Sequence, residues 1–407
     1  MSQAATTPAS TPIIRHVVTA PHLVHGCGSL DRLLDYLPLL NRPVRRIALI
    51  TQPSMDRLGV TERLVTMLQG DDIQTTVVRG VMPEPTIDNI ETVFLEQIAP
   101  TQPDAILAVG GGSVLDAAKL FAVRLTNGEQ TDATATTPLR DWLGVDKIAL
   151  PGVPLIAVPT TSGTGSEVTP NAIVTLPDES LKVGIVSRHL MPYLVLLDAT
   201  LTVSVPKPIT AATGMDAFVH ALESYISTKA NPVSDMYAMA SMRLIGANLV
   251  QAYENGSDLA AREAMLLGST YGGMALTAAG TAAVHALAYP LGGMFDVTHG
   301  VANAMLLPHV MAFNLDAIEP RLAEVARALN LAATSDSDAK AATNLMQQIV
   351  SWTAALAIPQ DLTAFGVRDE HVDALAAAAS KVTRLLGNNP KTLTLDDMRA
   401  IYRRLLP

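Results

Sequence analysis

The sequence is poor in cysteine, in aromatic residues and in charge, and these shortages exclude several classes of protein. Cys27 is the only cysteine among 407 residues, so the chain forms no intramolecular disulfide and no zinc site built from several thiolates. Charged residues make up 16%, and 38 acidic against 28 basic residues give a formal net charge of −10. A nucleic-acid-binding protein normally carries a basic surface instead. We therefore expect no nucleic-acid partner, and a cytoplasmic location.

One stretch of 32 residues, from Ala264 to Phe295, contains no Asp, Glu, Lys or Arg. About 20 apolar residues are enough to span a bilayer. Six glycines, Pro290 and His285 interrupt this stretch, however, and no cluster of Lys or Arg flanks either end. The pattern favours buried helices in a large core, so we expect no membrane partner.

Short apolar runs alternate with helical patterns in the first half of the chain, which predicts a parallel sheet covered on both faces. The expected strands are Ile47–Thr51, Thr75–Arg79, Asp104–Val109, Leu155–Val158 and Tyr193–Leu197. After Pro206, Ala, Met and Leu dominate and the helical pattern continues almost to the end. We predict a flexible tail at residues 1–13, an α/β Rossmann-like dinucleotide-binding domain at 14–205 and an all-helical domain at 206–407, which would hold the metal and the catalytic residues.

Two loops of small residues directly follow two of these strands. The first is Gly110–Ser113 and the second runs from Pro159 to Glu167. Glycine lets a phosphate approach the backbone, and the free N–H groups at a helix N-terminus bind the anion. The first loop does not match the Gly-x-Gly-x-x-Gly fingerprint, so a simple tight turn is an alternative. Together the two loops favour a dinucleotide bound across the sheet.

Acidic and histidine residues in the second half suggest a metal site. Asp216 and His220 are four residues apart and so share one face of a helix. His285 and His299 lie in glycine-rich apolar surroundings, and we expect Pro290 and the glycines after it to break the helix between them. One carboxylate and three imidazoles would bind Fe²⁺ or Zn²⁺. Histidines that only form hydrogen bonds in the core are the alternative.

A second catalytic pattern competes with the metal site. Tyr225 and Lys229 have the Tyr-x-x-x-Lys spacing of short-chain dehydrogenases. Those enzymes are shorter and carry their glycine loop near the N-terminus, whereas this tyrosine lies in the helical half. We interpret the match as chance.

Taken in order, these motifs resemble those of the iron-containing (group III) alcohol dehydrogenases. The resemblance runs from about residue 14 to the end of the chain. The shared motifs are Gly110–Ser113, Pro159–Thr169, Thr213–Ala217 with His220, Val284 with His285, and Thr298–Asn303. The resemblance implies a metal-dependent oxidoreductase, commonly a homodimer, that transfers a hydride between NAD or NADP and an alcohol–aldehyde (or ketone) pair.

The resemblance also implies roles for individual residues. The metal ligands would be Asp216, His220, His285 and His299. The cofactor-binding residues would be Gln52, Gly111, Gly112, Ser113, Thr160, Thr161, Thr164, Lys182, Leu201 and Val205. Within this set the glycine loop contacts the pyrophosphate, the threonines contact the nicotinamide end, and Lys182 lies near a ribose.

Two positions depart from the family pattern. Gln52 replaces an aspartate that binds the adenosine ribose, which removes a charge that would repel the 2′-phosphate of NADP. Tyr289 replaces a histidine near the nicotinamide, and we take it as the candidate catalytic residue. A phenol, with an ordinary pKa of roughly 10, shuttles protons less readily than imidazole.

The substrate is open at this point. Tyrosine at this position also occurs in the hydroxyacid–oxoacid transhydrogenase branch, so an oxoacid-directed enzyme of that kind, or a maleylacetate reductase, is an alternative. A dehydroquinate-synthase-like lyase is a third reading, and a non-catalytic binding protein a fourth.

Overall fold

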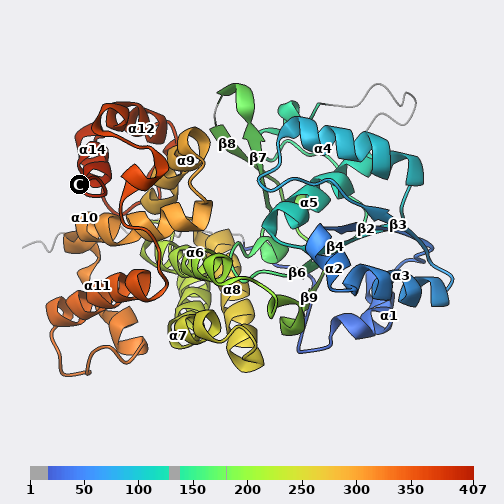
Figure 1. Cartoon of the computed structure of the whole chain (residues 1–407), viewed down its shortest axis with the longest axis horizontal. Helices are drawn as coiled ribbons and strands as arrows, with labels where there is room; N and C mark the ends of the chain where they lie inside the picture. The colour runs from blue at the N-terminus through green and yellow to red at the C-terminus, as the bar shows by residue number, and fades with distance from the viewer. Residues whose placement is uncertain (1–16, 128–137, 180) are drawn as a thin grey trace, which may run out of the picture.

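The computed structural model describes residues 17–127, 138–179 and 181–407, with an α/β half beside a helical half (Figure 1). The predicted fold class is confirmed, because a parallel six-stranded sheet flanked by helices is followed by an almost entirely helical region. The predicted tail at residues 1–13 lies outside the described residues. The division at residues 205 and 206 stays a prediction.

All six strands of the main sheet are parallel, in the order β1-β9-β6-β4-β2-β3. Their bounds are β1 (His22–His25), β2 (Arg46–Thr51), β3 (Gln74–Val78), β4 (Ala105–Gly110), β6 (Leu155–Pro159) and β9 (Leu194–Leu197). After β3 the chain crosses to the other side of β2, so the order reverses between β2 and β4. In open α/β sheets, ligands bind at the carboxyl ends of the strands beside such a switch point.

Alternate residues of each central strand pack against opposite layers. In β2, Ile47 and Leu49 face the layer of α1 (Leu33–Tyr36) and α3 (Val60–Gly70). Ala48 and Ile50 face the layer of α4 (Ile87–Val93) and α5 (Gly112–Asn127), while α2 (Pro53–Arg57) follows β2 directly. Burial on both faces explains why these strands read as continuous apolar runs.

Strand β1 and a second, smaller sheet were not predicted. β1 is a four-residue edge strand with a histidine at each end, so it has no apolar run to detect. The smaller sheet contains β5 (Gly144–Val145), β8 (Leu181–Val186) and β7 (Asn171–Leu176), and β7 and β8 pair antiparallel as a hairpin. This hairpin stands at the junction of the two halves, beside α9 (Ala283–Phe295) (Figure 1). It therefore carries residues of the α/β half to the helical half.

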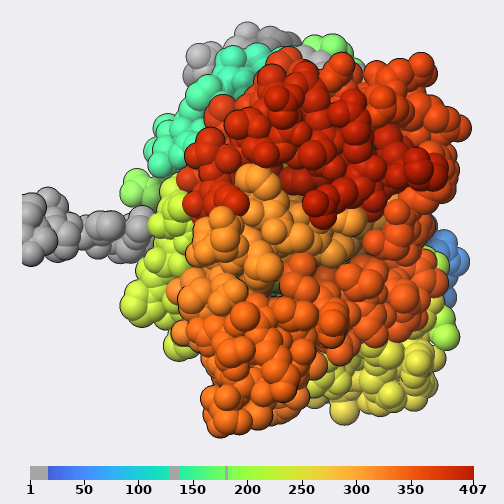
Figure 2. All heavy atoms as spheres, turned by 90° about the vertical axis from the view of Figure 1, so that its left-hand side faces the viewer, coloured from blue at the N-terminus to red at the C-terminus, as the bar shows by residue number. Residues whose placement is uncertain are grey.

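The helical half begins at Lys207, and its last segments form one end of the molecule (Figure 2). Its other helices are α6 (Lys207–Ile226), α7 (Pro232–Glu254), α8 (Leu259–Ala279), α10 (His299–Ala328), α11 (Asp338–Ala355), α12 (Val372–Ala379), α13 (Thr383–Leu386) and α14 (Leu395–Arg403).

The uncharged stretch Ala264–Phe295 contains α8 from Ala264 onward and all of α9, and these two helices meet at an angle of 107°. By length and composition, α10 alone or this bent pair is apolar enough to cross a membrane. In α10, however, 61% of the most apolar window is buried inside the protein. Core helices of this kind account for the low charge of the chain.

The expected helix break at Pro290 is wrong. Helix α9 continues through Pro290 and the two following glycines to Phe295. It ends at Asp296, whose φ of 53° is left-handed, and Gly280 with φ of 74° separates it from α8. Pro290 lies in a buried stretch of the helix. Packing there offsets the one backbone hydrogen bond that a proline cannot donate.

Candidate metal and cofactor site

Four side chains from three helices converge in the helical half. Asp216 and His220 come from α6, His285 from α9 and His299 from the first turn of α10. One carboxylate oxygen of Asp216 lies 3.9, 3.8 and 3.7 Å from the Nε2 atoms of His220, His285 and His299. The ligand atoms of the first three residues all lie within 4.8 Å of one another, and all three residues are buried.

The Asn303 side chain shows what this cluster attracts. Its amide Nδ2 lies 2.7 Å from Asp216 Oδ1 and 3.2 Å from Nε2 of both His285 and His299. Its own Oδ1 is buried without a hydrogen-bond partner among the described residues. Acceptor atoms thus converge on a single donor with a partial positive charge. Three nitrogens and one carboxylate oxygen in such an arrangement fit Fe²⁺ or Zn²⁺.

Outer hydrogen bonds turn two of the imidazoles toward the cluster. His285 Nδ1 lies 2.7 Å from Glu223 Oε2, and Glu223 also accepts from the backbone N–H groups of Ala282 and Val284. His220 Nδ1 lies 3.2 Å from the carbonyl oxygen of Gly163. In each ring the Nδ1–H is used outside the cluster, so the lone pair of Nε2 faces inward.

The pKa shifts match the protonation state that metal ligands need. Burial would raise the pKa of Asp216, but the imidazoles of His220, His299 and His285 together with Asn303 hold that pKa below its usual value. Burial lowers the pKa of His220, and it lowers the pKa of His299 to about 3. The carboxylate is therefore charged and these imidazoles are neutral at neutral pH, as ligands must be.

The two loops of small residues meet at the carboxyl edge of the sheet. A Cβ atom on Gly112 would lie 2.7 Å from Thr164 Cγ2, and one on Gly111 would lie 3.5 Å from Thr161 Oγ1. The backbone N–H of Thr160 donates to the carbonyl of Gly110. Helix α5 begins at Gly112, so the free N–H groups of its first turn lie where the two loops meet.

Gln52 and Ser113 lie at the same junction of the two loops. Gln52 follows β2, and its Oε1 is 3.5 Å from the backbone N of Gly111, which places it at the switch point. The Ser113 hydroxyl accepts from the backbone N–H of Glu84 at 3.0 Å. Lys182 of β8 forms an ion pair with Glu84 at 2.7 Å and is buried. Glu84 thus connects the glycine loop to the hairpin.

The two remaining predicted cofactor residues lie further along the edge, after β9. Leu201 is buried in the core beneath the sheet, and the carbonyl of Val205 accepts from Arg262. In the sheet, β6 lies between β9 and β4. Leu201 and Val205, which follow β9, are therefore separated by β6 from the glycine loop, which follows β4.

Tyr289 and Tyr225 have different surroundings. The Tyr289 ring is 5.9 Å from that of His299, and burial raises the pKa of its phenol, so it stays protonated. Tyr225 bonds through its hydroxyl to Glu324, and burial raises its pKa as well. A short-chain dehydrogenase lowers the pKa of its tyrosine instead, which argues against the Tyr225–Lys229 reading.

Comparisons with known proteins agree with this geometry. Residues 20–199 match the iron-containing alcohol dehydrogenase family, and residues 210–406 match its C-terminal part. A long-chain-alcohol dehydrogenase of Geobacillus thermodenitrificans is 37% identical over 95% of both chains, and an NAD-dependent methanol dehydrogenase of Bacillus methanolicus is 30% identical over 95% of this chain and 98% of its own. A crystal structure of 1,3-propanediol oxidoreductase superposes with a TM-score of 0.89 at 33% identity, covering 97% of this chain and 100% of the other.

The chain belongs to the iron-containing alcohol dehydrogenase family. It is an NAD(P)-dependent oxidoreductase that transfers a hydride between an alcohol and an aldehyde. The family also implies a bound metal, which the Asp/His cluster of this chain can hold.

Sequence reasoning missed several residues that shape this dehydrogenase site. Glu223 and Asn303 follow a predicted ligand by three and four positions, a spacing that places each beside that ligand on its helix. The Gly163 carbonyl is a backbone group, so no residue type marks it. Helical spacing could have found the first two, whereas only the fold reveals the third.

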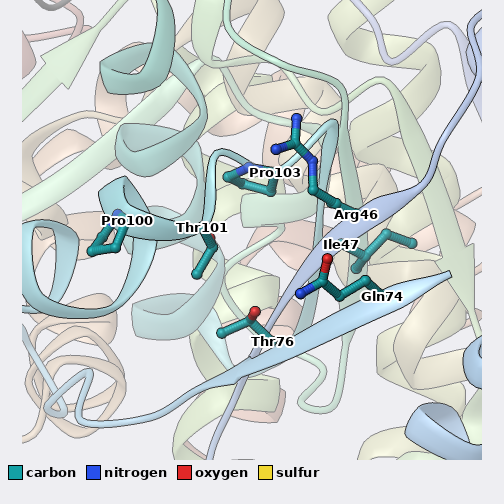
Figure 3. Close-up of a pocket in the computed structure, with 7 residues that line it drawn as sticks. All are labelled: Arg46, Ile47, Gln74, Thr76, Pro100, Thr101 and Pro103. Atoms are coloured by element: carbon teal, nitrogen blue, oxygen red, sulfur yellow. The ribbon is translucent and has the colours of Figure 1, made fainter.

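Two hollows among the described residues of the α/β half lie at the other end of the strands. One, of about 340 Å³, is lined by Arg46, Gln74 and Pro103, where β2, β3 and β4 begin (Figure 3). Arg46 is paired there with Asp104 at 3.2 Å. A dinucleotide at the carboxyl edge would not reach this hollow.

Proposed function

We propose that this enzyme binds one divalent ion, Fe²⁺ or Zn²⁺, through Asp216, His220, His285 and His299. The observation that carries the proposal is the convergence of three acceptor atoms, from Asp216, His285 and His299, on the single donor Asn303 Nδ2. The fourth acceptor, His220 Nε2, lies 3.9 Å from Asp216 Oδ1. Asp216 is charged there, and the imidazoles of His220 and His299 are neutral at neutral pH. A single carboxylate charge would leave a divalent ion with a net positive charge.

We further propose that NAD or NADP lies across the carboxyl edge of the sheet, with its pyrophosphate at Gly111, Gly112 and Ser113. The nicotinamide end would lie at Thr160, Thr161 and Thr164, and Lys182 near a ribose. Gln52 carries no charge, so the adenosine end accepts NADP as well as NAD. Leu201 and Val205 would border the adenosine. Support comes from the contact between the two loops and from the start of α5 at Gly112.

The chemistry divides between bound groups and the protein. When bound, the metal supplies a Lewis acid for the substrate oxygen and the nicotinamide supplies or accepts the hydride. The metal and the cofactor would be held next to each other, because the carbonyl of Gly163 in the threonine loop is hydrogen-bonded to His220 of the metal cluster. Buried apolar residues of α6, α9 and α10 exclude water from the cluster. The Tyr289 phenol, which stays protonated, donates a hydrogen bond at the substrate end.

The test is elemental analysis of the purified protein, followed by absorbance assays of NADH and NADPH with alcohols and aldehydes. We expect about one equivalent of metal per chain and turnover that a chelator removes. An oxoacid-directed enzyme is the second candidate, and hydride exchange between two organic acids without free cofactor would favour it.

We also propose that the enzyme is a cytoplasmic homodimer. A single exposed cysteine suits a reducing compartment, and association is common in the family. Light scattering after size-exclusion chromatography tests the dimer.

A further inference from the structure

Helix α9 and strand β8, at the junction of the two halves, carry a row of residues that extends away from the proposed metal ligands. On α9, His285, Tyr289 and Gly292 are spaced by four and three positions and share one helix face. On β8, Lys182 and Gly184 are two positions apart and share one face of the strand. These faces meet, since a Cβ atom on Gly292 would lie 3.0 Å from Lys182 Nζ.

Arg384 of α13 lies over this row. One guanidinium nitrogen, Nη2, is 3.9 Å from the position of a Cβ atom on Gly184. Burial raises the pKa of Tyr289, and the positive charge of Arg384 is the largest influence that lowers it. Tyr289 lies beside His299, so the row runs from the Asp/His cluster past Tyr289 and Gly292 to the face of β8 where Arg384 lies.

The charge of Arg384 is uncompensated, whereas several other basic side chains in the described parts of the chain are paired. Lys182 is paired with Glu84, while Arg399 and Arg403 of α14 pair with Asp373 and Asp369. Arg384 is exposed and forms no ion pair or side-chain hydrogen bond within the described ranges of the chain. An unpaired guanidinium beside an uncharged helix in an acidic protein is suited to bind an anion from solution.

We infer that Arg384 binds the anionic end of the substrate, and that the substrate class is an aldehyde or alcohol with a carboxylate at the far end of its chain. This inference rests on the proposed function, because it takes the other end of the substrate to lie at the Asp/His cluster. The guanidinium binds a carboxylate through two parallel hydrogen bonds. Tyr289 lies between the two ends, where its phenol contacts the chain of the substrate.

The experiment compares two aldehydes of equal chain length with the metal-loaded enzyme and NADH. 4-Oxobutanoate carries the carboxylate, butanal lacks it, and 6-oxohexanoate with hexanal gives a longer pair. The variants are Arg384→Gln and Arg384→Lys. Arg188→Gln is the matched control, since Arg188 is also exposed but lies beside the starts of β6 and β9, at the opposite edge of the sheet.

In the wild type we expect kcat/KM to favour one of the carboxylate-bearing aldehydes over its neutral partner by about tenfold or more. Arg384→Gln should lower that ratio by roughly 10- to 100-fold, mainly through KM, and Arg384→Lys should restore part of it. Arg188→Gln should leave the ratio as in the wild type. As a readout without turnover, butanoate should bind the wild-type enzyme more tightly than butanamide in calorimetry, and Arg384→Gln should remove the difference.

Several outcomes would overturn the inference. The wild type could show no higher kcat/KM for the charged aldehydes, or Arg384→Gln could lower kcat/KM equally for charged and neutral aldehydes. Arg188→Gln could lower the ratio as much as Arg384→Gln does. A raised Kd for NADH in Arg384→Gln would assign Arg384 to the cofactor instead. Failure of the proposed function itself is distinct: no NADH would be consumed with either aldehyde, and chelation would change nothing.

Discussion

The α/β half and the helical half contribute to the site in different ways. In the α/β half, the loops at the ends of β4 and β6 approach each other through their small residues, and each loop is continuous in sequence. In the helical half, side chains from α6, α9 and α10 form the cluster, and they span more than eighty residues from Asp216 to His299. The first kind of site depends on small residues that let backbones approach, and the second depends on packing that brings distant helices together.

This difference predicts that variants of the helical half should affect metal binding and that variants of the α/β half should affect cofactor binding.

The largest effect is expected for His285→Ala. Loss of one of four ligands should reduce the metal content toward zero and lower kcat by roughly a thousandfold or more, about 4 kcal/mol in activation free energy. Metal analysis and steady-state assays measure both. His309→Ala is the control, because His309 lies on α10 but outside the cluster. Full metal content and activity in His285→Ala would contradict the ligand assignment.

Glu223→Gln tests the outer hydrogen bonds of the same half. Glu223 accepts from His285 Nδ1 and from two backbone N–H groups, and a glutamine amide has only one oxygen to replace two. Metal affinity should fall by about 10- to 100-fold, as is typical when such a partner is removed. A competition titration with a chromogenic chelator measures it, with the exposed Glu254→Gln as control. Equal metal affinity in the two variants would refute the positioning role.

Gly112→Ala tests the α/β half. The added methyl group would lie 2.7 Å from Thr164 Cγ2, so the glycine and threonine loops must separate. Such overpacking costs about 1–3 kcal/mol. The Kd for NADH should therefore rise by about 10- to 100-fold, while the metal content should stay at the wild-type level. Fluorescence titration with NADH measures the change. Gly70→Ala is the control because nothing lies within 4 Å of its added Cβ. Loss of metal without loss of cofactor affinity would contradict the division between the halves.

The smallest effect concerns Glu167, which joins the two halves through a 2.7 Å hydrogen bond from Thr270 of α8. Burial raises its pKa above the usual 4.5. A group with a higher pKa in the folded state adds stability below its unfolded pKa, and the contribution is lost as pH rises through its folded pKa. Relative to Glu167→Gln, the wild type should therefore lose unfolding free energy as pH rises above about 4.5. Urea unfolding across pH measures this, with the exposed Glu62→Gln as control. Parallel pH profiles of Glu167→Gln and wild type would contradict it.

The same contrast explains what the sequence could and could not reveal. The five predicted strands are present because buried parallel strands leave continuous apolar runs, and the glycine loop follows β4 as expected. The β7–β8 hairpin was not predicted because buried and half-buried positions alternate along β7, so it has no continuous buried run. Strand β1 was not predicted because an edge strand of four residues needs no apolar run.

In the helical half, the i, i+4 spacing places Asp216 beside His220, but no local pattern places His285 and His299 with them. Those two histidines do come together, although the predicted mechanism was wrong: α9 runs through Pro290, and the turn follows Phe295. The positions of Asn303, Glu223 and Gly163 depend on how three helices and one loop pack. Their roles, and those of the four proposed ligands, stay predictions for the measurements above.

The central claim is that one divalent ion at the Asp/His cluster and a nicotinamide cofactor at the two loops act on one substrate. The most direct test follows the NADH absorbance of the purified enzyme with NAD and an alcohol before chelation, after chelation, and after return of Fe²⁺ or Zn²⁺. We predict NADH formation that disappears on chelation and returns with the ion, while NADH still binds the chelated protein. NADH formation that survives complete removal of the metal would contradict the account.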